Sequence, residues 1–322
     1  MEKFNKEFKK AFDLIESAEK ILIISHRNPD GDTIGSNLAL RQILLGSGKQ
    51  ITSLCADQIP FSLIFLPGSS SITIPLPELT PDLIITLDAS STEQIKYEEI
   101  ISIINKKKIP VINIDHHATN KNFGLVNIVM PEAASVTEVL YYFFDFLNAV
   151  ITPPIATCLL AGIYSDTGSF MHSNTNQNTF KIAGDLFCKG AAVSLIINNM
   201  FKTHTVEQLR LWGRVLENAR QNKNGSIVSK VTQTDFDDTG SSPRDLTGII
   251  NYLNSVPGAK MTILLAEDTK GNVKGSIRTQ NDKIDATKIS EKFGGGGHAK
   301  AAGFTIPGKI VSEEVWRIEK LD

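Results

Sequence analysis

Two short polar stretches of this chain carry the residue types that metal-dependent chemistry requires. They are residues 26–32, with the sequence HRNPDGD, and residues 115–117, with the sequence DHH. Imidazole and carboxylate groups together are ligands that divalent transition metals accept. Such ions can activate a water molecule and stabilise charge on phosphoryl oxygens. The two stretches therefore predict a hydrolase that cleaves a phosphate ester with two metal ions.

An apolar run that reads as a buried strand precedes each stretch, residues 21–24 in one case and 111–114 in the other. Ligands bind at the C-terminal ends of strands in open parallel sheets, so both stretches are expected at one sheet edge. There, His26, Asp30 and Asp32 would face one cavity, and the two carboxylates would repel each other unless a cation lay between them. The alternative is an ordinary turn in which an aspartate caps the next helix.

Asp115, His116 and His117 directly follow their predicted strand. One histidine can bind a metal ion while the other contacts the substrate. Asp115 can fix the tautomer of a histidine by accepting a hydrogen bond from its ring. Consecutive histidines also occur in surface loops without a function, but the preceding strand and aspartate favour a functional site.

Two further aspartates, Asp88 and Asp166, become candidate metal ligands because of where they lie relative to the predicted strands and helices. Asp88 follows the apolar run 83–87 and would lie at the same sheet edge, where its carboxylate could bridge two metal ions. A lone aspartate after a strand is otherwise usually a cap or turn residue. Asp166 follows the apolar segment 156–163, and a helix dipole disfavours an acid at a helix C-terminus. That placement suggests a ligand, although turns at helix ends often contain aspartate.

The C-terminal part of the chain contains a different candidate site. Gly294, Gly295, Gly296, Gly297 and His298 follow a helical segment. If they are ordered, their N–H groups can form a concave anion-binding site, to which His298 adds a donor. The alternative is a flexible loop.

Two other basic residues are weaker candidates. Arg278 alternates along a predicted strand and could reach the phosphate or base bound by the glycine run, or it could be solvated. His172 lies near the predicted metal site and could contact substrate, but the sequence assigns it no role.

Apolar, β-rich runs alternate with helical patterns from residue 21 to about residue 190. The predicted strands are residues 21–25, 50–56, 81–87 and 109–114, and the predicted helices are residues 35–45, 135–148, 153–163 and 178–189. This alternation predicts the α/β class, with a doubly wound and mainly parallel sheet.

The pattern changes after residue 200. Residues 203–222 are polar and helical in period, and they would form a connector or the last helix of the first domain. Predicted strands at 226–231, 261–266 and 273–279 and helices near 244–254 and 286–292 then form a smaller α+β domain. The predicted division is a metal-site domain at residues 1–200, a helical connector at 201–222 and a substrate-binding domain at 223–322.

Composition narrows the class of protein. The chain of 322 residues is 41% hydrophobic and 21% charged, which is typical of a folded globular protein. Its three cysteines, Cys55, Cys158 and Cys188, read as small core residues in a reducing compartment. There is no signal peptide and no apolar span of about 18 residues, so we expect a soluble cytoplasmic protein without a membrane partner.

Charge argues against binding to long duplex nucleic acid. The net charge is −2, with −5 on residues 1–190 and +3 on residues 191–322. Proteins that bind long duplexes usually carry dominant basic patches. The acidic half would gather metal ions and the basic half would meet an anionic substrate, although an imbalance this small also arises by chance.

Taken in order, these stretches resemble the DHH phosphoesterase family, in the branch with a C-terminal DHH-associated domain. The resemblance runs over nearly the whole chain, through residues 26–32, Asp88, residues 115–117, Asp166 and residues 294–298. Members of about this length are similar to bacterial oligoribonucleases that also remove phosphate from 3′-phosphoadenosine 5′-phosphate. The resemblance therefore implies hydrolysis of short RNA and of mononucleotide or dinucleotide substrates, and it allows a homodimer.

The resemblance also implies roles for individual residues. It makes His26, Asp30 and Asp88 ligands of one Mn²⁺, for which Mg²⁺ or Co²⁺ could substitute. The second ion would take Asp32, His116 and Asp166, with Asp88 as the shared ligand. His117 would contact the scissile phosphate beside Asp115 and Asp88, and Arg278 and residues 294–298 would bind the rest of the nucleotide.

Two other functions remain open from the sequence. The same ligands would serve a phosphodiesterase that cleaves cyclic di-AMP or linear dinucleotides. A nucleotide sensor without catalysis could also use this fold, although every expected ligand is present.

Overall fold

Six parallel strands form the sheet of the first part of the computed structural model, which describes residues 2–76 and 80–311. Their order in space is β3-β2-β1-β4-β5-β6. The strands are β1 (Lys20–Ser25), β2 (Gln50–Cys55), β3 (Ile72–Thr73), β4 (Leu83–Leu87), β5 (Val111–Asp115) and β6 (Val126–Val129). The four predicted strands are confirmed to within two residues, while β3 and β6 are too short to give a clear pattern.

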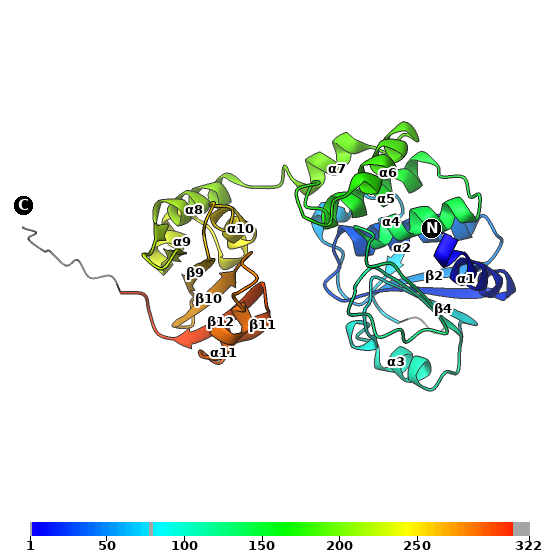
Figure 1. Ribbon diagram of the computed structural model, residues 1–322, viewed down its shortest axis with the longest axis horizontal. Coiled ribbons are helices and arrows are strands. Elements are labelled where there is room, and N and C mark those ends of the chain that lie inside the picture. The colour runs from blue at the N-terminus through cyan, green and yellow to red at the C-terminus, as the bar shows by residue number, and fades with distance from the viewer. Residues whose placement is uncertain (1, 77–79, 312–322) are drawn as a thin grey trace, which may run out of the picture. The chain divides into compact units, whose positions relative to one another are not determined.

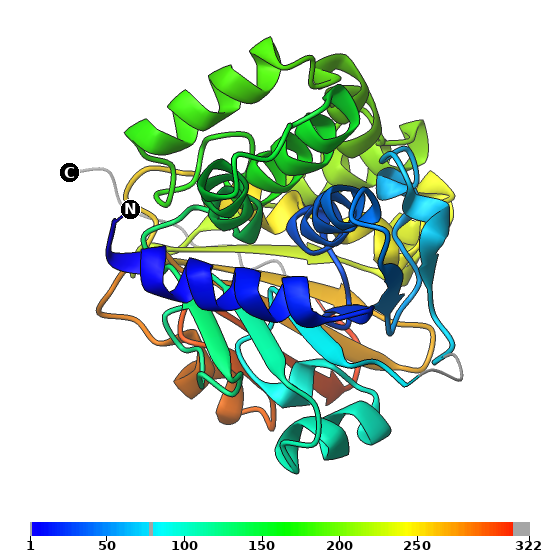
Figure 2. The ribbon, with the colours of Figure 1, turned by 90° about the vertical axis from the view of Figure 1, so that its right-hand side faces the viewer.

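Helices cover both faces of this sheet (Figures 1 and 2). On one face lie α1 (Asn5–Ser17), α2 (Gly31–Leu45), α4 (Val136–Phe146) and α5 (Pro153–Asp166), followed by α6 (Gln177–Cys188) and α7 (Val193–Met200). On the other face lies α3 (Glu98–Asn105). Alternate residues of β1 enter the two cores, Ile21 and Ile23 on one side and Leu22 and Ile24 on the other. Because both faces are covered, the strands are apolar throughout, as the predicted doubly wound sheet requires.

The order of the strands in this sheet predicts where a ligand would bind. The chain winds outward in one direction from β1 to β2 and β3, and in the other direction from β4 to β5 and β6. The crevice outside the carboxyl ends of the strands at such a reversal is where open α/β sheets bind ligands. The polar stretches after β1, β4 and β5 all begin at this edge.

Close packing between α2 and α5 brings a second set of polar residues to the same edge. At Gly35 in α2, a side chain would overlap the carbonyl oxygen of Cys158 and lie 3.4 Å from the backbone nitrogen of Gly162 in α5. At Gly31, a side chain would lie 2.6 Å from Cβ of Ser165. The glycines therefore allow the start of α2 to rest against the end of α5.

Two predicted helix boundaries were wrong. The helix expected at residue 35 begins at Gly31, because the Asp30 side chain caps it by accepting hydrogen bonds from the backbone N–H groups of Asp32 and Thr33. The helix expected to end at residue 163 continues to Asp166. Cys55 and Cys158 are buried as expected, whereas Cys188 is exposed.

The chain divides into two compact units, Met1–Thr203 and His204–Asp322. The predicted connector falls across this boundary, and its helix α8 (Val206–Glu217) packs within the second unit. Leu211, Trp212 and Val215 of α8 are buried there against Ile227 and Ile249. No helix in the described part of the chain is both long enough and apolar enough to span a bilayer.

A mixed sheet of six strands lies at the centre of the second unit, in the order β11-β12-β10-β9-β8-β7. The strands are β7 (Arg220–Gln221), β8 (Ser226–Val231), β9 (Met261–Glu267), β10 (Asn272–Arg278), β11 (Gly296–His298) and β12 (Ala301–Pro307). Strands β8 and β9 are parallel, and the other described pairs are antiparallel. The predicted α+β domain is thus confirmed.

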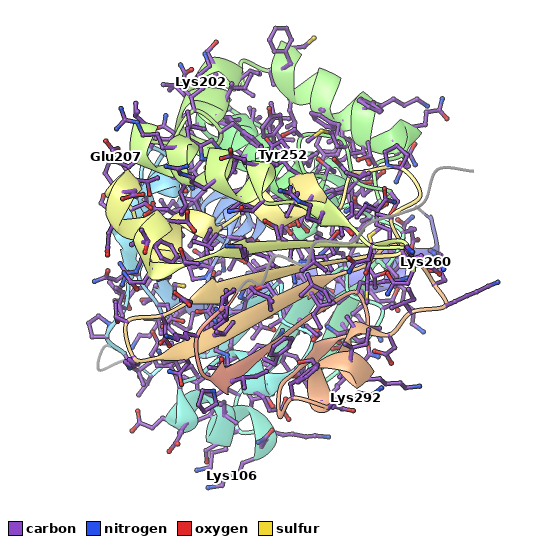
Figure 3. The ribbon with its side chains drawn as sticks, turned by 90° about the vertical axis from the view of Figure 1, so that its left-hand side faces the viewer. Lys106, Lys202, Glu207, Tyr252, Lys260 and Lys292 are labelled. Atoms are coloured by element: carbon purple, nitrogen blue, oxygen red, sulfur yellow. The ribbon has the colours of Figure 1, made fainter. Side chains whose placement is uncertain are left out.

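Helices also lie on both sides of the second sheet. They are α8, α9 (Gln233–Thr239) and α10 (Ile249–Leu253) on one side and α11 (Ala286–Glu291) on the other. Figure 3 shows Tyr252 of α10 and Lys292 at the end of α11 on opposite sides of the strands. Strand β12 was not predicted because it is rich in alanine and glycine, which have low strand propensity.

Candidate functional site

The turn after β1 brings the side chains of His26 and Asp30 to the sheet edge. Asp30 is the N-cap of α2, and its Oδ1 accepts hydrogen bonds from the backbone N–H groups of Asp32 and Thr33, each at 3.0 Å. Asn28 has a left-handed backbone with φ of 54°, which tightens the turn. His26 lies at its start, and its Nε2 is 3.1 Å from Oδ2 of Asp88. The cap, which the sequence offered as the alternative to metal binding, is thus present, and the same segment brings His26 close to Asp88.

A hydroxyl that sequence reasoning missed lies among these residues. Thr33 Oγ1 is 2.7 Å from Oδ2 of Asp88, 2.6 Å from Nε2 of His26 and 3.0 Å from Oδ1 of Asp30. The one possible signal was its place immediately after Asp32 in the turn. Thr33 thus contacts three of the predicted metal-binding residues at once.

Asp88 lies at the centre of the site, where both its backbone conformation and the burial of its carboxylate are energetically unfavourable. Its backbone is left-handed, with φ of 59°, which is uncommon for residues other than glycine. Its Oδ1 is buried and lacks a hydrogen-bond partner among the described residues. That oxygen lies 3.9 Å from Nε2 of His116 and 3.7 Å from Nδ1 of His117. A buried carboxylate oxygen without a partner is costly, and a bound cation would satisfy it.

Asp115 anchors the segment after β5. Its side chain is fully buried, and Oδ1 accepts hydrogen bonds from Nδ1 of His117 at 2.7 Å and from the backbone N–H of His116 at 2.8 Å. Oδ2 accepts a bond of 2.6 Å from the side-chain amide of Asn120, a residue that sequence reasoning also missed. Burial alone would raise the pKa of Asp115, but the bonds from His117 and Asn120 outweigh it and lower that pKa. Asp115 therefore remains ionised and orients His117.

His116 joins two deeper carboxylates. Its Nε2 is 3.2 Å from Oδ2 of Asp166, and its Nδ1 is 3.3 Å from the carbonyl oxygen of Ala133. Asp32 is completely buried, and its carboxylate accepts hydrogen bonds from the backbone N–H groups of Val136 at 2.6 Å and Thr137 at 2.9 Å. The start of α4 thus holds Asp32 beside His116.

These side chains form three overlapping groups that could hold a metal ion. In each group the ligand atoms lie within 4.8 Å of one another, and the groups are His26, Asp30 and Asp88; Asp32, His116 and Asp166; and Asp88, His116 and His117. Asp88 and His116 each belong to two groups. The mixture of imidazole and carboxylate donors suits divalent transition metals.

The charges of the site favour protons or cations. Burial raises the pKa of Asp32 well above its usual value, and the nearby carboxylates of Asp166 and Asp88 raise it further. Burial alone would lower the pKa of His26 and of His116, but their carboxylate neighbours raise these pKa values to about 9 and about 10. The hydrogen bond to Asp115 is the main reason that the pKa of His117 is raised. A metal ion at this edge would therefore have to displace protons from histidines.

His172 touches this site only through the backbone. Its Nδ1 lies 3.0 Å from the carbonyl oxygen of Asp166 at the end of α5, and the side chain is exposed. The side-chain amide of Asn174 donates to the same carbonyl oxygen at 3.3 Å. Both residues therefore cap the helix that presents the Asp166 carboxylate.

The second unit contains the remaining candidates. Arg278 lies at the end of β10, beside a depression of about 320 Å³. Its lining includes Lys274, Ser276 and Arg278 of β10, Thr305 of β12, Leu246 and Gly248 near α10, and the acidic residues Glu267 and Asp268. Both carboxylates accept hydrogen bonds from backbone N–H groups. Two cationic and two anionic side chains therefore share this depression.

The glycine run leads into β11 and pairs with β12. A side chain at Gly295 would overlap the carbonyl oxygen of Gly303, and one at Gly297 would lie 2.6 Å from Cα of Ala302. Gly294 and Gly296 have open space beside them. Close strand packing therefore explains two of the glycines, and anion binding stays a prediction for this run. The side chain of His298 lies outside what the structure describes.

Comparison with known proteins identifies relatives of both units. The model of the DHH family N-terminal domain matches residues 20–163, and that of the DHHA1 domain matches residues 224–319. A protein of Thermus thermophilus named bifunctional oligoribonuclease and PAP phosphatase NrnA is 32% identical over 299 residues, 92% of this chain and 87% of that protein. The protein of the same name from Bacillus subtilis is 24% identical over 89% of this chain and 90% of its own.

A solved structure has the same fold over nearly the whole length. It is an exopolyphosphatase-related protein from Bacteroides fragilis, with a TM-score of 0.82 and 27% sequence identity. The match covers 96% of this chain and 92% of that chain. The similarity thus includes both units and the segments that carry the acidic and histidine side chains.

Proposed function

Because the chain belongs to the DHH family, we propose that it is a metal-dependent phosphoesterase that degrades short oligoribonucleotides and removes phosphate from 3′-phosphoadenosine 5′-phosphate (PAP). The observation that carries this proposal is the meeting of seven imidazole and carboxylate side chains at one sheet edge, six of which are the proposed metal ligands. The similarity over 92% of the chain to an oligoribonuclease and PAP phosphatase supports the choice of substrate.

The proposal assigns the six side chains to two ions. His26, Asp30 and Asp88 would hold one, and Asp32, His116 and Asp166 would hold the other with Asp88 as a shared ligand. Mn²⁺ suits these donors, and Mg²⁺ or Co²⁺ could replace it. When bound, such ions lower the pKa of water and stabilise charge on phosphoryl oxygens. The unpartnered Oδ1 of Asp88 supports its assignment as the bridge.

His117 and Asp115 would act on the substrate side of the ions. The His117 side chain is 44% exposed, and its Nδ1 is engaged by Asp115, which leaves Nε2 for the substrate. The raised pKa of His117 favours the imidazolium form. In that form Nε2 carries a proton that it can donate to an oxygen of the scissile phosphate.

The second unit would bind the rest of the nucleotide. Arg278, the glycines of residues 294–297 and His298 are the proposed contacts. Arg278 and Lys274 line one depression of this sheet, together with Glu267 and Asp268, and these two cations are the groups there that could contact a phosphate. We also propose residues 1–200 and 223–322 as the catalytic and substrate-binding domains, with the link between them at 201–222.

The proposed partners follow from the same chemistry. Short RNA, mononucleotides and dinucleotides are favoured over long duplexes because the chain carries no net positive charge. Free thiols at all three cysteines fit a reducing cytoplasm without requiring it. A homodimer is proposed from the family resemblance alone.

Substrate competition tests the proposal. Purified full-length protein with Mn²⁺ is given PAP, RNA of two to five nucleotides, or cyclic di-AMP. We expect turnover of PAP and short RNA to exceed that of cyclic di-AMP. Faster cleavage of cyclic di-AMP would identify a cyclic dinucleotide phosphodiesterase. Binding without turnover of any substrate would identify a sensor.

A further inference from the structure

One short segment, Ala133–Thr137, contacts His116 and Asp32 directly and is joined to Asp166, the third member of their group, through Asn174. The carbonyl oxygen of Ala133 lies 3.3 Å from Nδ1 of His116. With a proton on Nδ1, this contact leaves Nε2 of His116 free to face the two carboxylates.

The same segment holds Asp32 by three hydrogen bonds. Oδ2 accepts from the backbone N–H of Val136 at 2.6 Å, and Oδ1 accepts from the backbone N–H and the hydroxyl of Thr137 at 2.9 and 2.7 Å. The two backbone N–H groups are the first of α4, and the first N–H groups of a helix have no partner within that helix. The position of Asp32 is therefore fixed by where α4 begins.

Asn174 connects the segment to the third member. Its side-chain amide lies 3.0 Å from the carbonyl oxygen of Ala134 and 3.3 Å from that of Asp166. The amide group can donate two hydrogen bonds, one to each carbonyl oxygen. Asn174 thus ties the end of α5 to the segment that holds His116 and Asp32.

Glu138 supports the segment from the other side. It is almost fully buried, and its Oε2 accepts hydrogen bonds from the backbone N–H of Ala134 at 3.2 Å and from the hydroxyl of Thr179 at 3.1 Å. In an ordinary capping box this side chain would bond the N–H of the N-cap residue, here Ser135. It reaches one residue further back, to the position that Asn174 also contacts.

The other candidate group has a separate support. Among the described residues, no hydrogen bond joins Ala133–Thr137 or Glu138 to His26 or Asp30. Those two residues and Asp88 are linked through the hydroxyl of Thr33. The two groups therefore meet at Asp88 and His116 and are joined by the hydrogen bond from the backbone N–H of Asp32 to Asp30. Their other supports belong to different parts of the fold.

We propose that Glu138 and Asn174 are positioning residues that set the affinity of the ion held by Asp32, His116 and Asp166, independently of the ion held by His26 and Asp30. This inference rests on the two-ion assignment proposed above. Partners that orient metal ligands typically change metal affinity by about 10- to 100-fold.

Metal titration of the full chain tests the inference. Metal-free wild type and the variants Asn174→Ala and Glu138→Leu are titrated with Mn²⁺ by calorimetry, and the bound ions are followed by electron paramagnetic resonance. We expect wild type to bind two ions with a spin-coupled signal. Each variant should lose about tenfold or more in the affinity of one ion only. At intermediate Mn²⁺ it should then show the signal of a single uncoupled ion.

Matched variants separate positioning from other effects. Glu138→Gln keeps an acceptor oxygen and should restore wild-type affinity, whereas a loss there would assign the effect to charge. Asn178→Ala removes a nearby exposed asparagine whose side chain makes no hydrogen bond within the described residues, and it should change nothing. Thr33→Val should weaken the other ion.

Several outcomes would overturn the inference. Equal weakening of both ions, or no change in Asn174→Ala, would do so. Asn174 is exposed, so that variant keeps the test valid if Glu138→Leu does not fold. Failure of wild type to bind two ions would instead reject the two-ion assignment in the proposed function.

Discussion

Three histidines approach Asp88, although its backbone is left-handed and one of its oxygens is buried without a partner. The carboxylate lies 3.1 Å from His26, 3.9 Å from His116 and 3.7 Å from His117. Unfavourable backbone conformations persist where surrounding structure enforces them, and they concentrate at functional sites. The residue that joins the candidate groups is therefore also one that the surrounding structure holds in an unfavourable conformation.

Asp88→Asn should abolish turnover while preserving the fold. Asparagine tolerates a left-handed backbone and keeps the shape of the side chain, but it lacks the charge that would bridge two ions. We expect kcat to fall by more than about a hundredfold, beyond the usual effect of losing an outer partner of a ligand. Steady-state kinetics on PAP would measure it, with the surface variant Asp13→Ala as control. Turnover near wild type would contradict the bridging role.

The histidine pKa values predict how the stability of the metal-free protein depends on pH. The pKa values of His26 and His116 rise from 6.5 to about 9 and about 10 in the folded state. A pKa raised by folding stabilises the protein below the unfolded value, and this stability is lost as pH rises through the folded value. With chelator present, the urea midpoint should fall between about pH 6.5 and pH 10. A midpoint that stays constant or rises over this range would contradict the assignment.

Sequence patterns predicted that these aspartates and histidines meet at one sheet edge, but not the contacts among them. The aspartates and histidines follow strand or helix ends, and parallel strands bring such ends together. Thr33, Asn120 and Asn174 were missed because each acts through contacts that only folding creates. Asn174, for example, bonds Ala134, which is 40 residues away in the sequence.

At the scale of elements, long apolar runs correctly predicted the main strands of the first sheet. Errors occurred where side-chain contacts outweigh the intrinsic preference of residues for helix or strand. Helix α2 begins at Gly31 and not at the predicted residue 35, because the Asp30 side chain caps it. Strand β12 contains weak strand-formers, and a side chain at its Gly303 would lie 3.2 Å from the carbonyl oxygen of Gly275 in β10. The ring of Phe304 in β12 occupies the space that a side chain at Gly275 would need.

Gly275→Val should therefore destabilise the second unit. The added side chain must displace the Phe304 ring, and overpacking of this kind costs about 1–3 kcal/mol in the free energy of unfolding. Both tryptophans follow residue 203 in the sequence, so tryptophan fluorescence during urea unfolding reports on this unit. Gly213→Ala in α8 has open space beside it and should be neutral or slightly stabilising. An unchanged midpoint for Gly275→Val would contradict the packing seen here.

At the scale of the whole molecule, the two units carry different chemistry. The six proposed metal ligands belong to the first unit, and Arg278 and the glycine run belong to the second. Each unit also has its own hydrophobic core. Metal binding should therefore stabilise one unit without a direct effect on the other.

Removal of metal tests this division. A ligand that binds only the folded state stabilises it by mass action. Chelation should abolish activity and lower the thermal midpoint followed by circular dichroism, which senses both units. The transition followed by tryptophan fluorescence should not move, and Mn²⁺ should reverse the changes. Equal shifts of both transitions would show that the units unfold together.

The left-handed backbone at Asp88 restricts which residues could replace it, because glycine, asparagine and aspartate are the residues that adopt such torsions routinely. Glycine would leave the His26 ring and the Thr33 hydroxyl without the oxygen that they contact. Asparagine would keep that oxygen but carry no charge. Aspartate is thus the one member of this narrow set that places an anion at this point of the chain.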